Sequence, residues 1–113
     1  MIEAYSAGQI KVDGRLYRKD VKIIHGRVEG DWWREEGHLV DENDVRDILS
    51  AGPKVLVIGT GYAGNMEVAG SLRSFLADRD IKLISENTFE ATRIFNDLAS
   101  RGEDVAGAFH LTC

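Results

Sequence analysis

Lys54-Val55-Leu56-Val57-Ile58-Gly59-Thr60-Gly61-Tyr62-Ala63-Gly64 is the stretch that decides the fold. Its four consecutive apolar residues, Val55 to Ile58, run directly into a glycine-rich turn. An uninterrupted apolar run of this length is typical of a strand that is buried on both faces of a parallel sheet. The stretch therefore predicts a central strand whose carboxyl end bends sharply into a loop.

Helix and strand patterns alternate along the chain after this strand. The first expected helix begins at Gly70-Ser71, with Ser71 as its cap, and a strand over 81–84 follows it. A second helix is capped by Asn87 or Thr88, and one of its faces carries Ala91, Ile94, Phe95 and Leu98. The last expected strand covers 105–109. A β-α-β-α-β order implies parallel strands that are joined by right-handed crossovers.

The chain before residue 54 carries antiparallel strand signals instead. Gln9 to Val12 and Arg15 to Arg18 alternate polar and apolar residues around Asp13-Gly14, which is typical of a two-residue hairpin turn. Two further strands are expected over 20–25 and 27–33, and the second is expected to run into the tryptophans.

A short helix connects this antiparallel block to the central strand. Asp41 is suited to cap the helix, and Gly52-Pro53 stops it. A chain of 113 residues is needed in full for one hydrophobic core, so residues 1–113 are expected to form a single domain. The fold class expected is α/β: a mixed central β-sheet with a parallel C-terminal β-α-β-α-β half, antiparallel N-terminal strands and a β-hairpin.

Composition and charge argue against several classes of function. The formal net charge is −5 and the basic residues are scattered, whereas a nucleic-acid surface needs a basic patch. The longest apolar run, Val55 to Ile58, falls far short of the roughly 20 residues of a membrane span. Neither a secretory signal nor a mitochondrial presequence is visible, and a single cysteine suits a reducing compartment. We therefore expect a cytoplasmic protein that binds neither nucleic acid nor membrane.

The loop from Gly59 to Gly64 reads literally as G-x-G-x-x-G, the fingerprint of dinucleotide-binding domains. The motif follows a buried strand, and Glu86 lies about 20 positions further on, where an acidic residue binds the ribose. Against this interpretation, the remaining chain supplies only half of such a domain, and Gly70-Ser71 delays the helix on which a pyrophosphate rests. In the alternative interpretation, the glycines only permit a tight exit from the strand.

Metal or thiol chemistry finds little support in the residue spacing. His25, His38 and His110 form no H-x-x-x-H pair, and a lone Cys113 supplies no C-x-x-C. On an extended strand end, His110 and Cys113 are expected to point to opposite faces. Cys113 as a nucleophile is disfavoured by the terminal carboxylate beside it, although its role stays open. We therefore expect no metal, no cofactor and no catalytic residue.

Trp32-Trp33-Arg34-Glu35-Glu36-Gly37-His38 is the most unusual local composition. One tryptophan is expected to pack inward and the other to stay near the surface, because neighbours on a strand face opposite sides. Arg34 is suited to stacking on an aromatic ring or holding an anion, and the imidazole of His38 is a polar group that can donate or accept a hydrogen bond. Beside the glycine turn, these groups form either a polar pocket or a salt-bridged cover over the sheet edge.

Several segments, taken in order, are similar to a known family. They are Trp33-Arg34-Glu35, Gly37-His38, Val57 to Gly61, Thr88 to Asn96, and the ending Phe109-His110-Leu111-Thr112-Cys113. In this order they resemble the Mth-type domain family of unknown function, which includes the adipogenesis-associated Mth-type-domain protein and a mitochondrial complex I assembly factor. The resemblance covers nearly the whole chain. It implies an α/β fold with a mixed central sheet, helices packed on it and a β-hairpin extension, and no established enzymatic activity.

The resemblance also narrows the functional expectation. The family pattern at the central turn is Ile-Gly-x-Gly, so Gly64 falls outside it and the dinucleotide fingerprint becomes a chance extension. We predict a non-catalytic protein that binds a partner protein or a small anionic ligand at a pocket near Gly59-Thr60-Gly61. The alternative is a nucleotide-binding protein or enzyme that uses the Gly59–Gly64 loop and Glu86. The candidate binding residues are Trp33, Arg34, His38, Gly59, Thr60, Gly61, Thr88 and His110.

Overall fold

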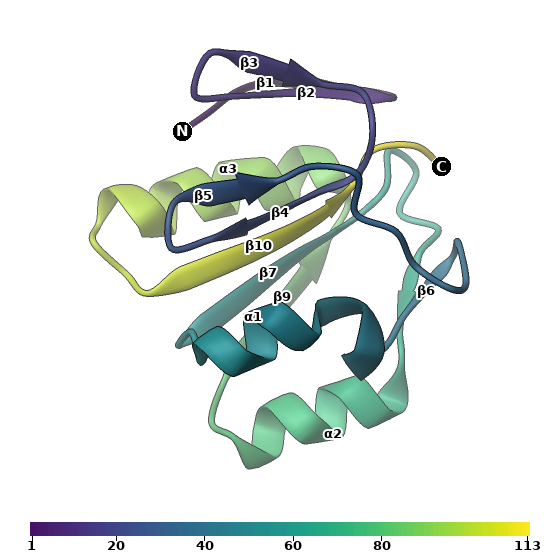
Figure 1. Cartoon of the computed structure of the whole chain (residues 1–113), viewed down its shortest axis with the longest axis vertical. Helices are drawn as coiled ribbons and strands as arrows, with labels where there is room; N and C mark the ends of the chain where they lie inside the picture. Colours follow the sequence, from purple (N-terminus) through teal and green to yellow (C-terminus); the bar gives the residue numbers. More distant parts are fainter.

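The computed structural model describes residues 1–113 and places the apolar run inside a five-stranded sheet, as the central one of its three parallel strands (Figure 1). β7 (Val55–Thr60) is buried at every position and lies between β10 (Val105–His110) and β9 (Lys82–Glu86), both of which run parallel to it. The strand order is β5-β4-β10-β7-β9. The central parallel strand is therefore confirmed.

The antiparallel strands β4 (Val21–Ile24) and β5 (Arg27–Glu29) extend this sheet beyond β10 and make it mixed. The turn between them has a positive φ at both His25 and Gly26, 50° and 76°, as a type I′ hairpin turn requires. β5 ends at Glu29, so the expectation that it runs into the tryptophans is wrong. Asp31 has a positive φ of 53°, which takes the chain out of the extended conformation.

The first three strands form a separate antiparallel sheet, which packs beside α3 (Figure 1). β2 (Gln9–Val12) and β3 (Arg15–Tyr17) form the expected hairpin around Asp13-Gly14, where φ is 48° and 82°. β1 (Ile2–Ser6) was not expected, because only Ile2 in this strand is fully buried and no alternating pattern marks it.

The helix before β7 begins as one 3₁₀ turn, η1 (Glu42–Val45), and continues as α1 (Arg46–Ala51). The side chain of Asp41 accepts hydrogen bonds from the N–H groups of Asn43 and Asp44, and the Asp44 side chain accepts one from the Asp41 N–H. This capping box confirms Asp41 as the start signal.

The other helices begin close to the expected positions. α2 (Gly70–Asp78) begins at Gly70, but Ser71 does not cap it: the Ser71 hydroxyl donates to Glu42 at 2.7 Å instead. α3 (Thr88–Ser100) is capped by Asn87, whose side chain accepts from the N–H of Glu90. Two short segments that were not expected as strands, β6 (Leu39–Val40) and β8 (Glu67–Val68), pair in parallel before α2.

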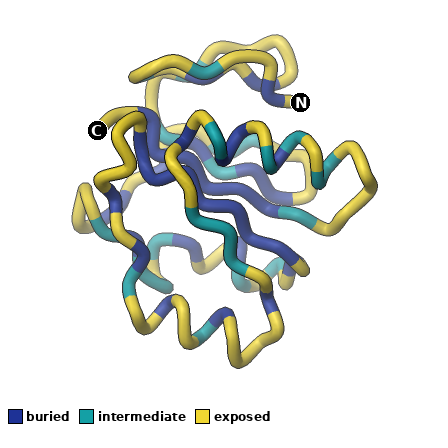
Figure 2. Tube along the Cα trace, turned by 180° about the vertical axis from the view of Figure 1, so that it is seen from behind, coloured by how far each residue is buried: buried dark blue, intermediate teal, exposed yellow.

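The helices cover both faces of the five-stranded sheet, and alternate residues of β7 enter two separate cores (Figures 1 and 2). On one face, Leu56 and Ile58 pack with Leu72 and Leu76 of α2. On the other face, the core residues from β7 and α3 are Val55, Val57, Ala91 and Phe95. The predicted mixed α/β fold is therefore confirmed. None of its helices has the length and apolar composition needed to span a lipid bilayer.

The two crossovers leave the sheet on opposite faces, and this positions the site. β7 leads to α2 on one face, whereas its neighbour β9 leads to α3 on the other. The loops that follow β7 and β9 therefore diverge at the edge where the parallel strands end, which we call the carboxyl edge. In open α/β sheets, ligands bind at such a switch point.

Candidate functional site

The carboxylate of Asp20 connects three segments that are distant in the sequence. Its Oδ2 atom lies 2.7 Å from Arg34 Nη1 and 2.7 Å from His110 Nδ1, and its Oδ1 atom accepts the N–H of Leu111 at 2.8 Å. Asp20 directly precedes β4, Arg34 follows β5, and His110 ends β10. All three groups therefore meet at the carboxyl edge, where Arg34 and His110 are buried.

The hydrogen bonds to Asp20 determine the tautomer of His110. Burial acts to raise the pKa of Asp20, but hydrogen bonds from His110, Arg34 and the Leu111 N–H outweigh it and hold that pKa below its ordinary value. Asp20 is therefore a carboxylate near pH 7. Arg34 Nη2 also lies 3.0 Å from His110 Nδ1, but the Asp20 oxygen is closer, at 2.7 Å, so we assign the ring proton to Nδ1, where it avoids the repulsion of two lone pairs. In the neutral ring, the free lone pair is then on Nε2.

Both terminal nitrogens of the Arg34 guanidinium are engaged within the chain, whereas its buried Nε atom has no hydrogen-bond partner. Its Nη2 atom donates to the carbonyl of Gly37 at 2.9 Å, and its guanidinium lies 4.7 Å from the ring centroid of Trp32. The expected stacking is thus confirmed, and so is the expected division of the tryptophans, since Trp32 is buried and Trp33 exposed. Because Asp20 neutralises Arg34, this arginine is not free to hold an anion.

The Gly59-Thr60-Gly61 turn is packed too closely for side chains at its glycines. A Cβ atom at Gly59 would lie 2.8 Å from Thr88 Oγ1. Gly61 has a φ of 109°, and a Cβ atom there would overlap the carbonyl oxygen of Thr112. Both glycines are therefore explained by close approach of other chain segments, as the tight-exit interpretation requires.

Most backbone N–H groups of the glycine loop are already hydrogen-bonded. Gly61 donates to Thr88 Oγ1 at 2.8 Å. Tyr62 and Asn65 donate to the carbonyls of Thr112 and Cys113 at 3.2 and 3.3 Å. A pyrophosphate site needs such groups to be free, at the start of a helix. Through these hydrogen bonds, the loop instead links the end of β7 to α3 and to the residues that follow β10.

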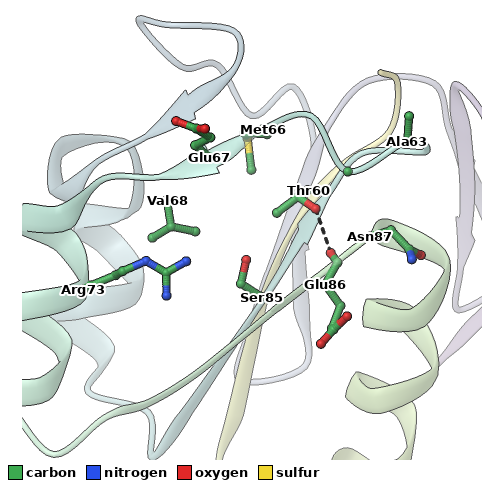
Figure 3. A pocket seen from close by; sticks show the side chains of 10 residues that line it. Thr60, Ala63, Met66, Glu67, Val68, Arg73, Ser85, Glu86 and Asn87 are labelled. Carbon is green, nitrogen blue, oxygen red and sulfur yellow. Dashed lines mark hydrogen bonds between the residues drawn. The ribbon is translucent and has the colours of Figure 1, made fainter.

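A cleft of about 530 Å³ opens beside the glycine loop, between the carboxyl ends of β7 and β9 (Figure 3). Thr60 and Gly64 line it from the loop, and the Thr60 hydroxyl donates to the Glu86 carbonyl at 3.1 Å. Its charged groups are one cation, Arg73, and two carboxylates, Glu67 and Glu86. The cleft lies at the switch point of the sheet, but its acidic excess does not favour an anion.

Seven of the eight candidate residues gather at the carboxyl edge. Thr88 Oγ1 donates to the His110 carbonyl, and the rings of His38 and His110 have centroids 6.3 Å apart. Trp33 follows β5 at the same edge, but its side chain is exposed and makes none of these contacts. The gathered candidates are Arg34, His38, Gly59, Thr60, Gly61, Thr88 and His110.

The expectation that His110 and Cys113 point to opposite faces is wrong. β10 ends at His110, so strand alternation does not extend to Cys113. The Cys113 thiol and one ring nitrogen each from His38 and His110 lie within 4.8 Å of one another. This proximity depends on the path of the chain after the strand, which residue spacing does not reveal.

Sequence reasoning also missed Asp20. It was included in a strand over 20–25, and its side-chain partners are 14 and 90 positions away. An acidic residue directly before a β-branched strand carries no functional signal by itself. Only the pairing of β4 with β10 brings its carboxylate beside His110.

Comparisons with known proteins agree with this fold. The family model described as "Protein of unknown function (DUF498/DUF598)" matches residues 2–110. The conserved hypothetical protein PH1505 from Pyrococcus horikoshii OT3 is similar at a TM-score of 0.85 and 24% identity, over 100% of this chain and 99% of that one. The structure described as MT938 is similar at a TM-score of 0.84 and 28% identity, over 100% of this chain and 98% of that one. A Bordetella pertussis protein described as a Mth938-like domain is similar at a TM-score of 0.71 and 18% identity, over 98% of this chain and 85% of that one.

Proposed function

Since this chain belongs to the DUF498/DUF598 family of proteins of unknown function, we propose that it is a non-catalytic binding protein whose partner is another protein. The partner binds at the carboxyl edge of the sheet, around the Gly59-Thr60-Gly61 turn. A cytoplasmic location is part of this proposal, on the ground of composition and the single cysteine.

One observation carries the proposal: three exposed aromatic side chains lie in segments that directly follow strands ending at this edge. Trp33, Tyr62 and Phe89 are 77%, 64% and 56% exposed. Trp33 follows β5, Tyr62 follows β7, and Phe89 lies in the first turn of α3, directly after β9. Aromatic residues are enriched where proteins bind each other, and more than half of the surface of each of these residues is exposed in the isolated chain.

Electrostatics favour a partner with a basic face over a small anion. Arg34 is neutralised by Asp20, and in the neighbouring cleft Arg73 is outnumbered by two carboxylates. The whole chain carries a formal net charge of −5. Charge complementarity then speeds the encounter with a basic surface and slows it with an acidic one.

The test compares capture of partners by the wild type and by a variant with Trp33→Ser, Tyr62→Ser and Phe89→Ser. The control is Leu16→Ser, because Leu16 is an exposed apolar residue in the β2–β3 hairpin, outside the five-stranded sheet. We expect a protein captured by the wild type and by the control to be lost from the triple variant. Purified, that protein should bind the triple variant at least about tenfold more weakly. Equal binding by all three chains would overturn the proposal.

A nucleotide remains the second candidate, because Gly64 and Glu86 line the same cleft. Thermal unfolding with ATP, NAD and inorganic phosphate tests it. A ligand at 100 times its Kd stabilises by about 2.7 kcal/mol, which is easily measured. Glu86→Gln is the suitable variant, since Gly61→Val would disrupt the turn itself. A rise in Tm that Glu86→Gln abolishes would replace the protein partner with a nucleotide.

A further inference from the structure

His110 has a buried ring nitrogen without a partner. Its side chain is 7% exposed, and Nε2 makes no hydrogen bond, although Nδ1 is held by Asp20. A buried polar atom left unpaired is destabilising, and most such atoms in folded proteins are paired. The unpaired Nε2 is therefore available to a ligand at this position.

The space that Nε2 faces also contains Cys113. The Cδ2 atom of His110, which is bonded to Nε2, lies 3.1 Å from where a Cβ atom of residue 61 would be, and the carbonyl carbon of Cys113 lies 3.0 Å from the same point. Glycine at position 61 thus lets the end of the chain, at Thr112 and Cys113, pack close to this edge of the His110 ring. The opposite edge of the ring, with Nδ1, faces Asp20 and Arg34.

His38 completes a cluster of three metal-binding side chains. The Cys113 thiol and one ring nitrogen from each histidine lie within 4.8 Å of one another. Around a tetrahedral Zn²⁺ ion, such atoms are about 3.5 Å apart. His38 and Cys113 are exposed and lie outside helices and long strands, so they can move by about the required 1 Å while His110 stays fixed.

We propose that His38, His110 and Cys113 bind one Zn²⁺ ion within a single chain. A thiolate with two imidazoles is a ligand set that suits Zn²⁺, and three protein ligands leave a fourth position for water. Cys113 releases its thiol proton to solvent when the sulfur–zinc bond forms. Because Asp20 already balances Arg34, the thiolate charge is available to the metal.

Asp20 has a positioning role at this site. A carboxylate that accepts the second N–H of a metal-binding histidine fixes the ring orientation and makes the ligating nitrogen more basic. Asp20 makes that contact with His110 at 2.7 Å. The zinc site is independent of the proposed protein partner, and either one can fail without the other.

The test titrates Zn²⁺ into the reduced, metal-free full chain in competition with a chromophoric chelator. We expect one Zn²⁺ per chain with a submicromolar Kd. His38→Ala and Cys113→Ser should each weaken binding at least about tenfold. His25→Ala is the matched control and should bind normally, because His25 is an exposed histidine at the opposite edge of the sheet.

Two further measurements make the outcome decisive. Co²⁺ should give a thiolate-to-cobalt charge-transfer band that Cys113→Ser abolishes, and Zn²⁺ should protect Cys113 from alkylation. Asp20→Asn, checked for folding by circular dichroism, should lower affinity about 10–100-fold. Binding that is unchanged in both His38→Ala and Cys113→Ser would overturn the proposal, and so would half a metal per chain or alkylation at the same rate with Zn²⁺ present.

Discussion

At Asp20, one carboxylate accepts hydrogen bonds from the side chains of Arg34 and His110 and from the N–H of Leu111. The Arg34 side chain is 5% exposed and that of Asp20 15%, so this ion pair is largely removed from water. A buried pair of this kind adds little net stability over apolar residues, but it is costly to break from one side. The importance of Asp20 for stability therefore lies mainly in balancing the buried charge of Arg34, which would be unpaired if Asp20 were removed.

Asp20→Asn should lower the free energy of unfolding by about 3 kcal/mol, because it leaves the Arg34 guanidinium buried without its counter-charge. Urea denaturation in the presence of a chelator measures this without any metal contribution. Asp31→Asn is the matched control, since the exposed Asp31–Lys19 pair should contribute less than about 1 kcal/mol. Equal effects of the two substitutions would contradict the role of Asp20.

The contribution of Asp20 should also depend on pH. Its pKa is lower in the folded chain than in the unfolded chain, so the folded state favours the carboxylate. The stability advantage of the wild type over Asp20→Asn is then constant above about pH 4, the unfolded pKa, and shrinks as the pH falls through the folded pKa. Urea unfolding of both chains between neutral and acidic pH measures this difference, and an advantage that grows on acidification would exclude the mechanism.

At the scale of elements, the turn after β7 depends on two separate properties of Gly61. Its φ of 109° is a conformation that other residues rarely adopt, and its missing side chain lets Thr112 approach. Gly26 shares the first property, with a φ of 76°, but no atom lies within 4 Å of where its Cβ would be. The two positions therefore separate backbone strain from steric overlap.

Gly61→Ala should lower the free energy of unfolding by about 3 kcal/mol or more, because strain and overlap add. Gly26→Ala should lower it by only about 1 kcal/mol, because strain acts alone. Chemical denaturation of both variants gives the comparison. If Gly26→Ala were as destabilising as Gly61→Ala, the close approach of Thr112 would not explain the turn.

At the scale of the whole molecule, the β1–β3 sheet is tied to the rest by one side chain in particular. Asn96 of α3 accepts the N–H of Ile2 at 3.0 Å and donates to its carbonyl at 2.8 Å, as a neighbouring strand would. Apolar contacts support this link, since Ile2, Ile10 and Val12 share a core with α3.

Asn96→Ala should therefore loosen the small sheet selectively. Loss of both hydrogen bonds is expected to lower the free energy of unfolding by about 1–2 kcal/mol. Hydrogen–deuterium exchange should become faster in β1 and β2 but stay slow in β7. The control, Asn43→Ala, removes an exposed amide near α1 and should leave exchange in β1 unchanged. Faster exchange throughout the chain would mean that the two sheets unfold as one unit.

Local signals were sufficient to predict the mixed α/β fold. The apolar run of β7, the I′ hairpin turn at Asp13-Gly14 and the Asp41 cap each act within a few residues. β1, β6 and β8 were missed because short strands depend on distant partners for their stability. Dependence on distant partners also explains which site residues could be predicted. The order of the family-like segments identified Arg34, His38 and His110 as candidates. Asp20 was missed because only the pairing of β4 with β10 brings its carboxylate to His110.

The strand order has a consequence for how the chain is made. β10 lies between β4 and β7, yet a ribosome synthesises it after every other strand. Until β10 emerges, the facing edges of β4 and β7 have unpaired N–H and C=O groups, which are a template for pairing with other chains. The main sheet of the nascent protein therefore closes in one late step, by insertion of β10 between β4 and β7.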